Sequence, residues 1–117
     1  MEFKALTALN GLPTNEVRRL YQDKEGYLWI ATTDGLCSYD GYQIKIYKSN
    51  MYSPELLSNN NIRCVAEDAH HHLYIGTNSG LNILDKQTGI MRNTQNKEFL
   101  NNVITAILIT RSGIVFI

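Results

Sequence analysis

Four acidic residues in the first half of the chain have the types needed for acid–base chemistry. They are Asp23, Glu25, Asp34 and Asp40. A glycosidase needs two carboxyl groups about 5–9.5 Å apart, one to protonate the leaving group and one to attack the sugar or activate water. Asp23 and Asp40 instead occupy turn positions, where a carboxylate accepts backbone N–H groups. The sequence therefore predicts structural carboxylates and no catalytic residue.

His70, His71 and His72 form the cluster that most resembles a metal site. Consecutive side chains alternate in direction on an extended chain, so at most the first and third could share an ion. No nearby cysteine completes a ligand set of the kind that zinc prefers. We expect a solvated, irregular turn here and predict neither a metal nor another cofactor.

Tyrosines are concentrated in the first half of the chain, where exposed rings could stack on a sugar while polar side chains bind its hydroxyl groups. They are Tyr21, Tyr27, Tyr39, Tyr42, Tyr47 and Tyr52. Most of them fall on strand or turn positions, which favours packing over binding. Both interpretations stay open at this stage, and no ligand-binding residue is assigned.

The bulk composition excludes some classes of partner. The 117 residues carry eleven basic and eleven acidic side chains, so no net charge attracts nucleic acid or an anionic membrane. The apolar runs are too short to span a bilayer, and the first residues lack the apolar core of a signal peptide. Cys37 and Cys64 occupy non-equivalent positions, and we expect two buried free thiols instead of a disulfide.

The segments that position these residues occur more than once. Residues 17–40 return as 62–85, 45 positions later, and a third copy starts at Ile104, a further 42 positions on. A period of about 40–45 residues is typical of propeller blades, and propellers have about 4–8 of them. We therefore expect an all-β fold, a partial β-propeller. It should have about two complete four-stranded antiparallel blades and incomplete blades at both ends.

Alignment of the copies resolves the secondary structure. Residues 17–22 alone could form a short helix, but their counterpart in the third copy is rich in β-branched residues and favours a strand in every copy. Gly, Asn and Asp signals then bound strands at 17–22, 27–32, 36–39, 43–48, 62–67, 73–77, 81–84 and 90–93. Residues 3–6 and the third copy should supply three more, about eleven in all.

The blade boundaries follow from this alignment. Residues 1–14 should hold the outer strand of a preceding blade and a connector, 15–50 blade 1, 51–100 blade 2 with its connectors, and 101–117 the first two strands of a truncated blade 3. Open blade faces and strand edges are expected to drive self-association.

The turns have chemical reasons for their residues. At 23–26, Asp23 accepts backbone N–H groups and Gly26 supplies a positive φ, so His71, its counterpart, must adopt the left-handed conformation or use another turn. The pair Asp40 and Gly41 predicts a two-residue type I′ hairpin, whose central residues both need positive φ.

Residues that coincide between copies are expected to build turns and inter-blade packing. One aromatic residue is placed in each copy, as Trp29, Tyr74 and Phe116. The full set of predicted structural motif residues is Asp23, Gly26, Trp29, Thr32, Gly35, Asp40, Gly41, Asp68, Tyr74, Gly76, Thr77, Gly80, Asp85, Gly113 and Phe116.

These motifs resemble the two-component regulator propeller repeat. In the order of that family, the first copy has Gly11-Leu12-Pro13, Asn15, Asp23, Gly26, Leu28-Trp29-Ile30-Ala31-Thr32, Gly35-Leu36 and Tyr39-Asp40-Gly41. The second copy keeps Asn61, Asp68, Leu73, Ile75-Gly76-Thr77, Gly80-Leu81 and Asp85, and the third keeps Asn102, Gly113, Phe116 and Ile117. The departures from the pattern are Ala31, His71, Tyr74 and Thr110.

The resemblance implies a fragment of the periplasmic, ligand-sensing propeller of a Bacteroidetes hybrid two-component sensor histidine kinase/response regulator. The implied partner is a small carbohydrate-like ligand of the full-length protein. The kinase, receiver and DNA-binding parts are not in this segment, so the resemblance implies no enzymatic activity for it. Two alternatives stay open: a propeller enzyme such as a polysaccharide lyase, and a non-catalytic scaffold for protein interactions.

Overall fold

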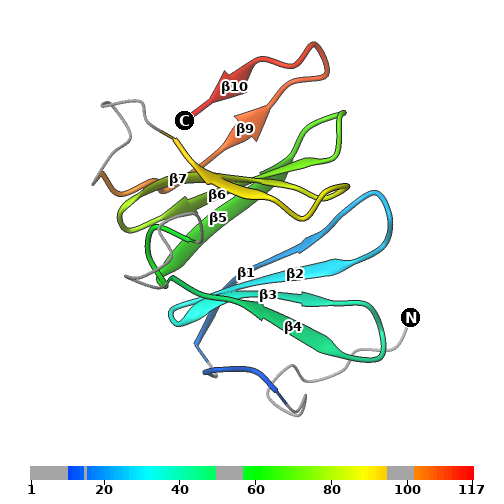
Figure 1. Ribbon diagram of the computed structural model, residues 1–117. Coiled ribbons are helices and arrows are strands. Elements are labelled where there is room, and N and C mark those ends of the chain that lie inside the picture. Colours follow the sequence, from blue (N-terminus) through cyan, green and yellow to red (C-terminus); the bar gives the residue numbers. More distant parts are fainter. Residues whose placement is uncertain (1–10, 15, 50–56, 95–101) are drawn as a thin grey trace.

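The regular structure consists of β-strands throughout the residues that the computed structural model describes, which are 11–14, 16–49, 57–94 and 102–117. The first sheet contains β1 (Val17–Gln22), β2 (Leu28–Thr32), β3 (Gly35–Tyr39) and β4 (Ile44–Tyr47). The second contains β5 (Ile62–Glu67), β6 (His72–Thr77), β7 (Gly80–Asp85) and β8 (Met91–Asn93). The third contains β9 (Leu108–Ile109) and β10 (Val115–Phe116). Each sheet is an antiparallel meander (Figure 1).

The first two sheets pair their strands in the same register. Leu20 faces Ile30 in the first hairpin, and Val65 faces Ile75 at the equivalent place in the second. Both ladders also shift register near the start of the first strand, after Val17 and after Ile62. The strand prediction for 17–22 is confirmed, because cross-strand pairing overrides the local helical pattern.

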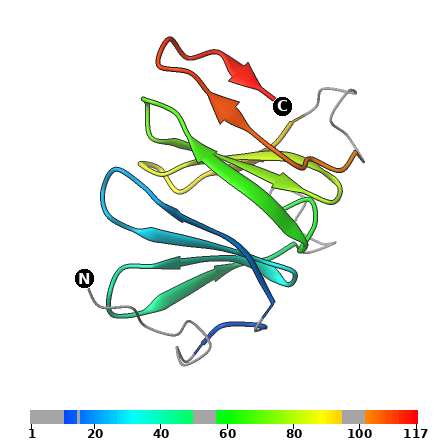
Figure 2. The same ribbon diagram turned by 180° about the vertical axis from the view of Figure 1, so that it is seen from behind.

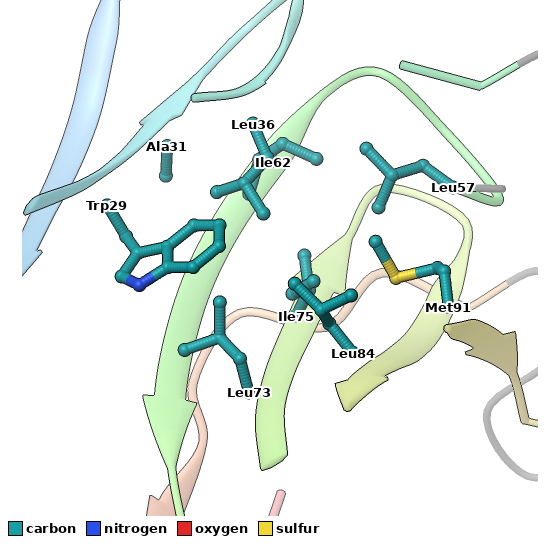
Figure 3. Packing of buried hydrophobic residues seen from close by; sticks show 9 residues of the cluster. All are labelled: Trp29, Ala31, Leu36, Leu57, Ile62, Leu73, Ile75, Leu84 and Met91. Atoms are coloured by element: carbon teal, nitrogen blue, oxygen red, sulfur yellow. The ribbon is translucent and has the colours of Figure 1, made fainter. Parts of the chain in front are cut away.

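The first two sheets pack face to face around one apolar core (Figure 3). Successive side chains of a strand point to opposite faces, so Trp29 and Ala31 share one face of β2. They meet the facing side of the second sheet, and full burial of each Leu or Ile there contributes about 1.5–3 kcal/mol. The buried members of this core are Trp29, Ala31, Leu36, Leu57, Ile62, Leu73, Ile75, Leu84 and Met91.

The first strands of the three sheets lie side by side, with β5 between β1 and β9 (Figure 2). Two equivalent backbone bonds connect neighbouring sheets: Gly35 N donates to Asn60 O at 2.6 Å, and Gly80 N donates to Asn102 O at 2.8 Å. The counterpart of Asn102 in the second copy is therefore Asn60, and the sequence alignment that placed Asn61 there was wrong by one residue.

The second and third sheets approach more closely than the first and second at one point. A Cβ added to Gly76 would lie 2.5 Å from Cys64 Sγ and 2.6 Å from Ile104 Cγ2, so no side chain fits there. The equivalent residue of the first sheet is Ala31, which is fully buried and keeps its methyl group. Glycine at 76 is thus a packing requirement of the third sheet.

The third sheet consists of two strands of two residues each, β9 and β10. Ile104 is buried and its N–H donates to Thr77 O at 2.9 Å, so the chain is anchored to the second sheet there. In the second sheet Ile62, the counterpart of Ile104, pairs with Thr77. The counterpart of Thr77 in the third copy would fall after Ile117. Only β9 and β10 therefore form a ladder in the described part of this copy. The predicted strand at 3–6 lies outside the described residues.

The hairpin predicted at Asp40 and Gly41 is wrong in its turn type. Tyr39 pairs with Ile44, so four residues connect β3 and β4, and Gly41 has positive φ but Asp40 does not. The Asp40 carboxylate accepts from Tyr42 N at 2.8 Å and from Gln43 N at 2.9 Å. These two bonds close a longer loop without the left-handed aspartate that a type I′ turn needs.

Both cysteines are buried and neither is in a disulfide, as predicted. Burial raises the pKa of Cys37 to about 11 and also raises the pKa of Cys64. These thiols are therefore poor nucleophiles at neutral pH.

No helix in the described ranges is long and apolar enough to cross a membrane.

Candidate functional site

Asp23 organises the turn between β1 and β2 and also holds Trp29. One carboxylate oxygen, Oδ1, accepts from Glu25 N at 3.0 Å and from Tyr27 N at 2.9 Å. The other, Oδ2, accepts from Trp29 Nε1 at 2.8 Å. Because the Asp23 residue is buried, these bonds compensate for the loss of water around its charge. The result is an indole ring fixed in orientation at the edge of the core.

The second copy uses a histidine where the first uses tryptophan. Asp68 Oδ1 accepts from His70 N at 2.7 Å and from His72 N at 3.0 Å, and Asp68 Oδ2 lies 2.9 Å from His72 Nδ1. His71 adopts the left-handed conformation with a φ of 66°, one of the two solutions expected for this turn. Tyr74 at the aromatic position is therefore not tied to the aspartate.

In the third copy both partners of this pair are changed together. Thr110 replaces the aspartate, and its hydroxyl oxygen accepts from Ile114 N at 3.0 Å. The turn closes through Gly113 N, which donates to Thr110 O at 3.0 Å. Phe116, at the aromatic position, has no N–H to donate. The third copy therefore lacks both the aromatic N–H donor that Trp29 supplies and the second carboxylate oxygen that would accept from it.

Lys86 joins the two sheets, because it binds Asp23 and Glu25 of the first sheet and Glu67 of its own. Its ammonium group lies 3.1 Å from Asp23 Oδ2 and 2.8 Å from Glu25 Oε2, and it also binds Glu67 Oε2. The side chains of Asp23 and Glu67 are 0% and 1% exposed, and that of Lys86 is 9% exposed. Glu67 Oε1 also accepts from Lys24 N at 3.1 Å. The β1–β2 turn of the first sheet is thereby fastened to the second.

These contacts change the titration of the groups involved. Hydrogen bonds from Lys86 and then His71 lower the pKa of Glu25 to about 2. Burial alone would lower the pKa of Lys86, but its bonds to Glu25, Glu67 and Asp23 outweigh burial and raise it. Lys86 and Glu25 are therefore both charged across the physiological range.

Among the described residues, Asp23, Glu25 and Glu67 offer oxygen atoms within 4.8 Å of one another, close enough to surround a cation. Lys86 supplies that positive charge, so the cluster is explained without a metal. The three histidines do not converge: His71 Nδ1 lies 2.8 Å from Glu25 Oε1, and His72 is bound to Asp68.

The remaining candidate carboxylates, Asp34 and Asp40, lie at opposite ends of β3 and form no glycosidase pair with each other. Asp34 lies in the β2–β3 turn, at the opposite end of β2 from Asp23, and pairs with Lys48 at 3.1 Å. Asp40 closes the β3–β4 loop, and hydrogen bonds from Gln43 N and Tyr42 N lower its pKa. Both carboxylates are thus bound by neighbouring groups of their own sheet, as expected for residues with a structural role.

A groove of about 270 Å³ opens between the first two sheets, next to Lys86. Trp29, Ser38 and Lys45 are cross-strand neighbours in the first sheet and line the groove. Tyr47 also lines it, and its ring centroid lies 5.8 Å from that of Trp29 at an interplanar angle of 37°. Tyr27, which is 47% exposed, forms another part of the wall. Aromatic surface and polar side chains thus meet at one opening.

The other tyrosines have different surroundings. Tyr21 packs against the core, and Tyr39 donates its hydroxyl proton to Gly41 O at 3.0 Å. Tyr42 is 94% exposed and does not line the groove. Tyr52 lies outside the described residues. The sequence predicted packing for most tyrosines, and the structure adds two that line a groove.

The repeated threonines and glycines build the β2–β3 and β6–β7 turns. Thr32 Oγ1 donates to Gly35 O at 2.6 Å, and Thr77 Oγ1 donates to Gly80 O at 3.0 Å. Gly35 has a φ of 123°, and a Cβ there would lie 2.9 Å from Tyr47 O. In the β7–β8 loop, Asp85 Oδ1 accepts from Gln87 N at 2.9 Å.

The sequence analysis missed Lys86 and Glu67. Lys86 lies in the one hairpin loop that differs in length between the two complete copies: residues 85–90 separate the paired Leu84 and Met91, whereas 40–43 separate Tyr39 and Ile44. This difference in length was the available signal. Glu67 gives no such signal, since its counterpart Gln22 is also polar.

The stacked meanders, with their first strands side by side, define the class of this protein: it is a partial β-propeller, as the sequence predicted. Its fold is similar to that of the extracellular domain of a hybrid two component system of B. thetaiotaomicron, with a TM-score of 0.71 and 18% identity. The similarity covers 87% of this chain and 14% of that one. At this identity it shows the fold.

Residues 11–34 and 56–79 match the two component regulator propeller family. These two segments match that family's repeat, and the resemblance seen in the sequence is confirmed. A stretch of 48 residues is 46% identical to Histidine kinase P4 of Formosa agariphila. This stretch is 41% of the chain and 4% of the kinase, so the chain spans a small part of that relative.

Proposed function

We propose that this chain is part of the extracytoplasmic, ligand-sensing propeller of a hybrid two-component sensor histidine kinase/response regulator, and that its signal is derived from a carbohydrate. The observation that carries the proposal is the family match in both complete copies, 11–34 and 56–79. The propeller fold and the local identity to a histidine kinase support it. Location in the periplasm is part of the same proposal.

Signalling in this proposal is a shift between arrangements of domains or subunits. A ligand shifts such an equilibrium only by its difference in affinity for the two states. The propeller would bind the signal, and a kinase elsewhere in the intact protein would report it. No phosphorylation chemistry is assigned to the described residues.

The intact protein tests this function directly. It would be reconstituted in vesicles, and incorporation of phosphate into its kinase would be measured with and without oligosaccharides from plant and host polysaccharides. We expect at least one oligosaccharide to change the rate in a saturable manner. A parent gene without a kinase or a transmembrane segment would defeat the proposal.

Turnover of the same oligosaccharides separates a sensor from a propeller enzyme. Product formation would be followed by chromatography, and the sensor proposal expects none. If products appear and depend on a residue of the propeller, the enzyme alternative replaces it. Absence of both binding and turnover would leave the scaffold alternative.

We also propose that the chain self-associates through its third sheet. Leu108, Ile114 and Phe116 are 63%, 55% and 55% exposed, and in the two complete sheets the equivalent faces pack against a neighbour. A second copy could cover them head to tail. Sedimentation velocity should show concentration-dependent association that Phe116→Asp weakens. A monomer at all concentrations would contradict this.

A further inference from the structure

The groove between the first two sheets has binding capacity that the fold does not use. Ser38, Gln43 and Lys45 line it, and within the described part of the chain their side chains make no hydrogen bond or ion pair. Lys45 Nζ does lie 4.9 Å from the centroid of the Tyr47 ring. Polar groups that converge on a concave surface without partners are the usual means by which a site orients a ligand.

Trp29 and Tyr47 in the wall of this groove are held by neighbouring contacts. Trp29 packs on Tyr47 and is bound through its indole N–H to Asp23, which is itself bound to Lys86. Tyr27 follows the turn that Asp23 closes, and its backbone N–H is one of the groups that Asp23 fixes. A preorganised wall loses little conformational freedom when a ligand binds.

The polar groups of the groove match hydroxyl groups better than an anion. Lys45 is a donor, Gln43 and Ser38 offer donors and acceptors, and Asp40 offers a carboxylate acceptor. A sugar hydroxyl needs both kinds of partner, whereas a phosphate or carboxylate needs donors and is repelled by Asp40. The charge of Lys86 is already balanced by three carboxylates.

We propose that this groove is a subsite for one ring of a neutral saccharide, with the apolar face of the ring on Tyr27 and its hydroxyl groups on Gln43, Ser38 and Lys45. The groove, at about 270 Å³, is just below the range of about 300–1,000 Å³ that encloses drug-sized ligands, which suits a single ring. Leu84 and Lys86 of the second sheet also line it, so the ligand contacts both sheets. This inference rests on the proposed sensing function and names its ligand class and place.

Tryptophan fluorescence tests the subsite in the chain itself, because Trp29 is its single tryptophan and lines the groove. The probes are cellobiose, xylobiose and methyl glucoside, with glucuronate and sodium phosphate as anionic comparisons. We expect a saturable change with at least one neutral probe and none with the anions. A stronger response to an anion, or none to any neutral probe, would overturn the proposal.

Variants identify the residues that bind. Tyr27→Ala should weaken the responding saccharide at least tenfold, about 1.4 kcal/mol, whereas Tyr27→Phe keeps the ring and most of the affinity. Gln43→Ala should cost roughly 2–10-fold. Tyr42→Ala is the matched control. Tyr42 lies in the β3–β4 loop of the same sheet as Tyr27, is 94% exposed and does not line the groove. Equal affinity of Tyr27→Ala and wild type would refute the site.

Nuclear magnetic resonance of the wild-type chain tests the site without any variant, so its result does not depend on whether the variants fold. Saccharide should shift the Gln43 side-chain amide and the Trp29 indole N–H together, and shifts confined to other residues would refute the groove. Titrations of the intact sensor region separate the two proposals. Binding there that Tyr27→Ala leaves unchanged refutes the groove alone, whereas absence of saccharide binding refutes both.

Discussion

At the first seam, between the first and second sheets, Trp29 is 3% exposed, whereas the equivalent Phe116 of the third sheet is 55% exposed. Between them, at the second seam, Tyr74 is partly buried against Cys64, Leu81 and Ile104. The three aromatic residues occupy the same place in the repeat, so their burial reports how completely the following sheet covers them. The aromatic residue of each sheet is therefore buried by the sheet that follows it in the chain.

The two seams also differ in their polar contacts. The first is fastened by Lys86, which binds Asp23 and Glu25 across it, and the second by a close approach at Gly76. The groove proposed as a saccharide subsite opens at the first seam. Three substitutions and a change of pH test the difference between the two seams.

Trp29→Ala should have the largest effect. Removing this buried ring should lower the free energy of unfolding by about 3–5 kcal/mol, and it also leaves Asp23 Oδ2 without the indole donor. Phe116→Ala is the control, with an expected change within about 0.5 kcal/mol because its ring is mostly exposed. Urea denaturation measures both. Similar losses at the two positions would contradict the difference between the seams.

Lys86→Met should follow. The substitution leaves Asp23, Glu25 and Glu67 without their shared cation, and breaking a buried ion pair costs about 3–5 kcal/mol. We expect the lower end, about 3 kcal/mol, because Glu25 is 38% exposed to water. Lys48→Met is the matched control, since its exposed pair with Asp34 is worth about 0–1 kcal/mol. If the two variants unfold alike, Lys86 does not fasten the seam.

Gly76→Ala tests the second seam. A methyl group would contact Cys64 and Ile104 too closely, so we expect a loss of about 1–3 kcal/mol. At the first seam the reverse change, Ala31→Gly, removes a buried methyl and should cost about 1 kcal/mol. Denaturation with the fluorescence of Trp29 as probe gives both values. Tolerance of alanine at 76 would show that the third sheet does not pack against it.

Acid should weaken the first seam. The pKa of Glu25 is lowered from 4.5 to about 2, so its stabilising contribution is present above pH 4.5 and is lost as the pH falls towards about 2. Unfolding free energies measured across this range should decline more steeply in the wild type than in Lys86→Met, which lacks the largest cause of the shift. Parallel declines would contradict the assignment.

Much of this fold was predictable because the copies inform each other. The bounds of β1 and β5 match the prediction, although 17–22 alone resembled a helix. The turn at Asp40 was predicted wrongly, because a local dipeptide signal does not show that the carboxylate closes a longer loop. Asp23 was predicted as a turn residue, yet its bond to Trp29 depends on how the strand folds back.

The candidate groove was less accessible to prediction. Tyr27 and Tyr47 were recognised as possible sugar contacts, but their meeting with Ser38 and Gln43 depends on the pairing of β2, β3 and β4. Lys86 and Glu67 come together only when two sheets stack, and no periodicity encodes that. The strand bounds were thus predictable from the copies, whereas the side-chain contacts that shape the groove and join the sheets were not.

Hydrogen exchange at individual amides shows whether each sheet is stabilised by the sheet that covers it. At concentrations where the chain is monomeric, amides of β2 and β6 should exchange only with global unfolding, at the full free energy of the fold. Amides of β9 and β10, on the uncovered third sheet, should open at a free energy several kcal/mol lower, about that of a fraying end. Equal protection of β10 and β2 in the monomer would contradict the claim.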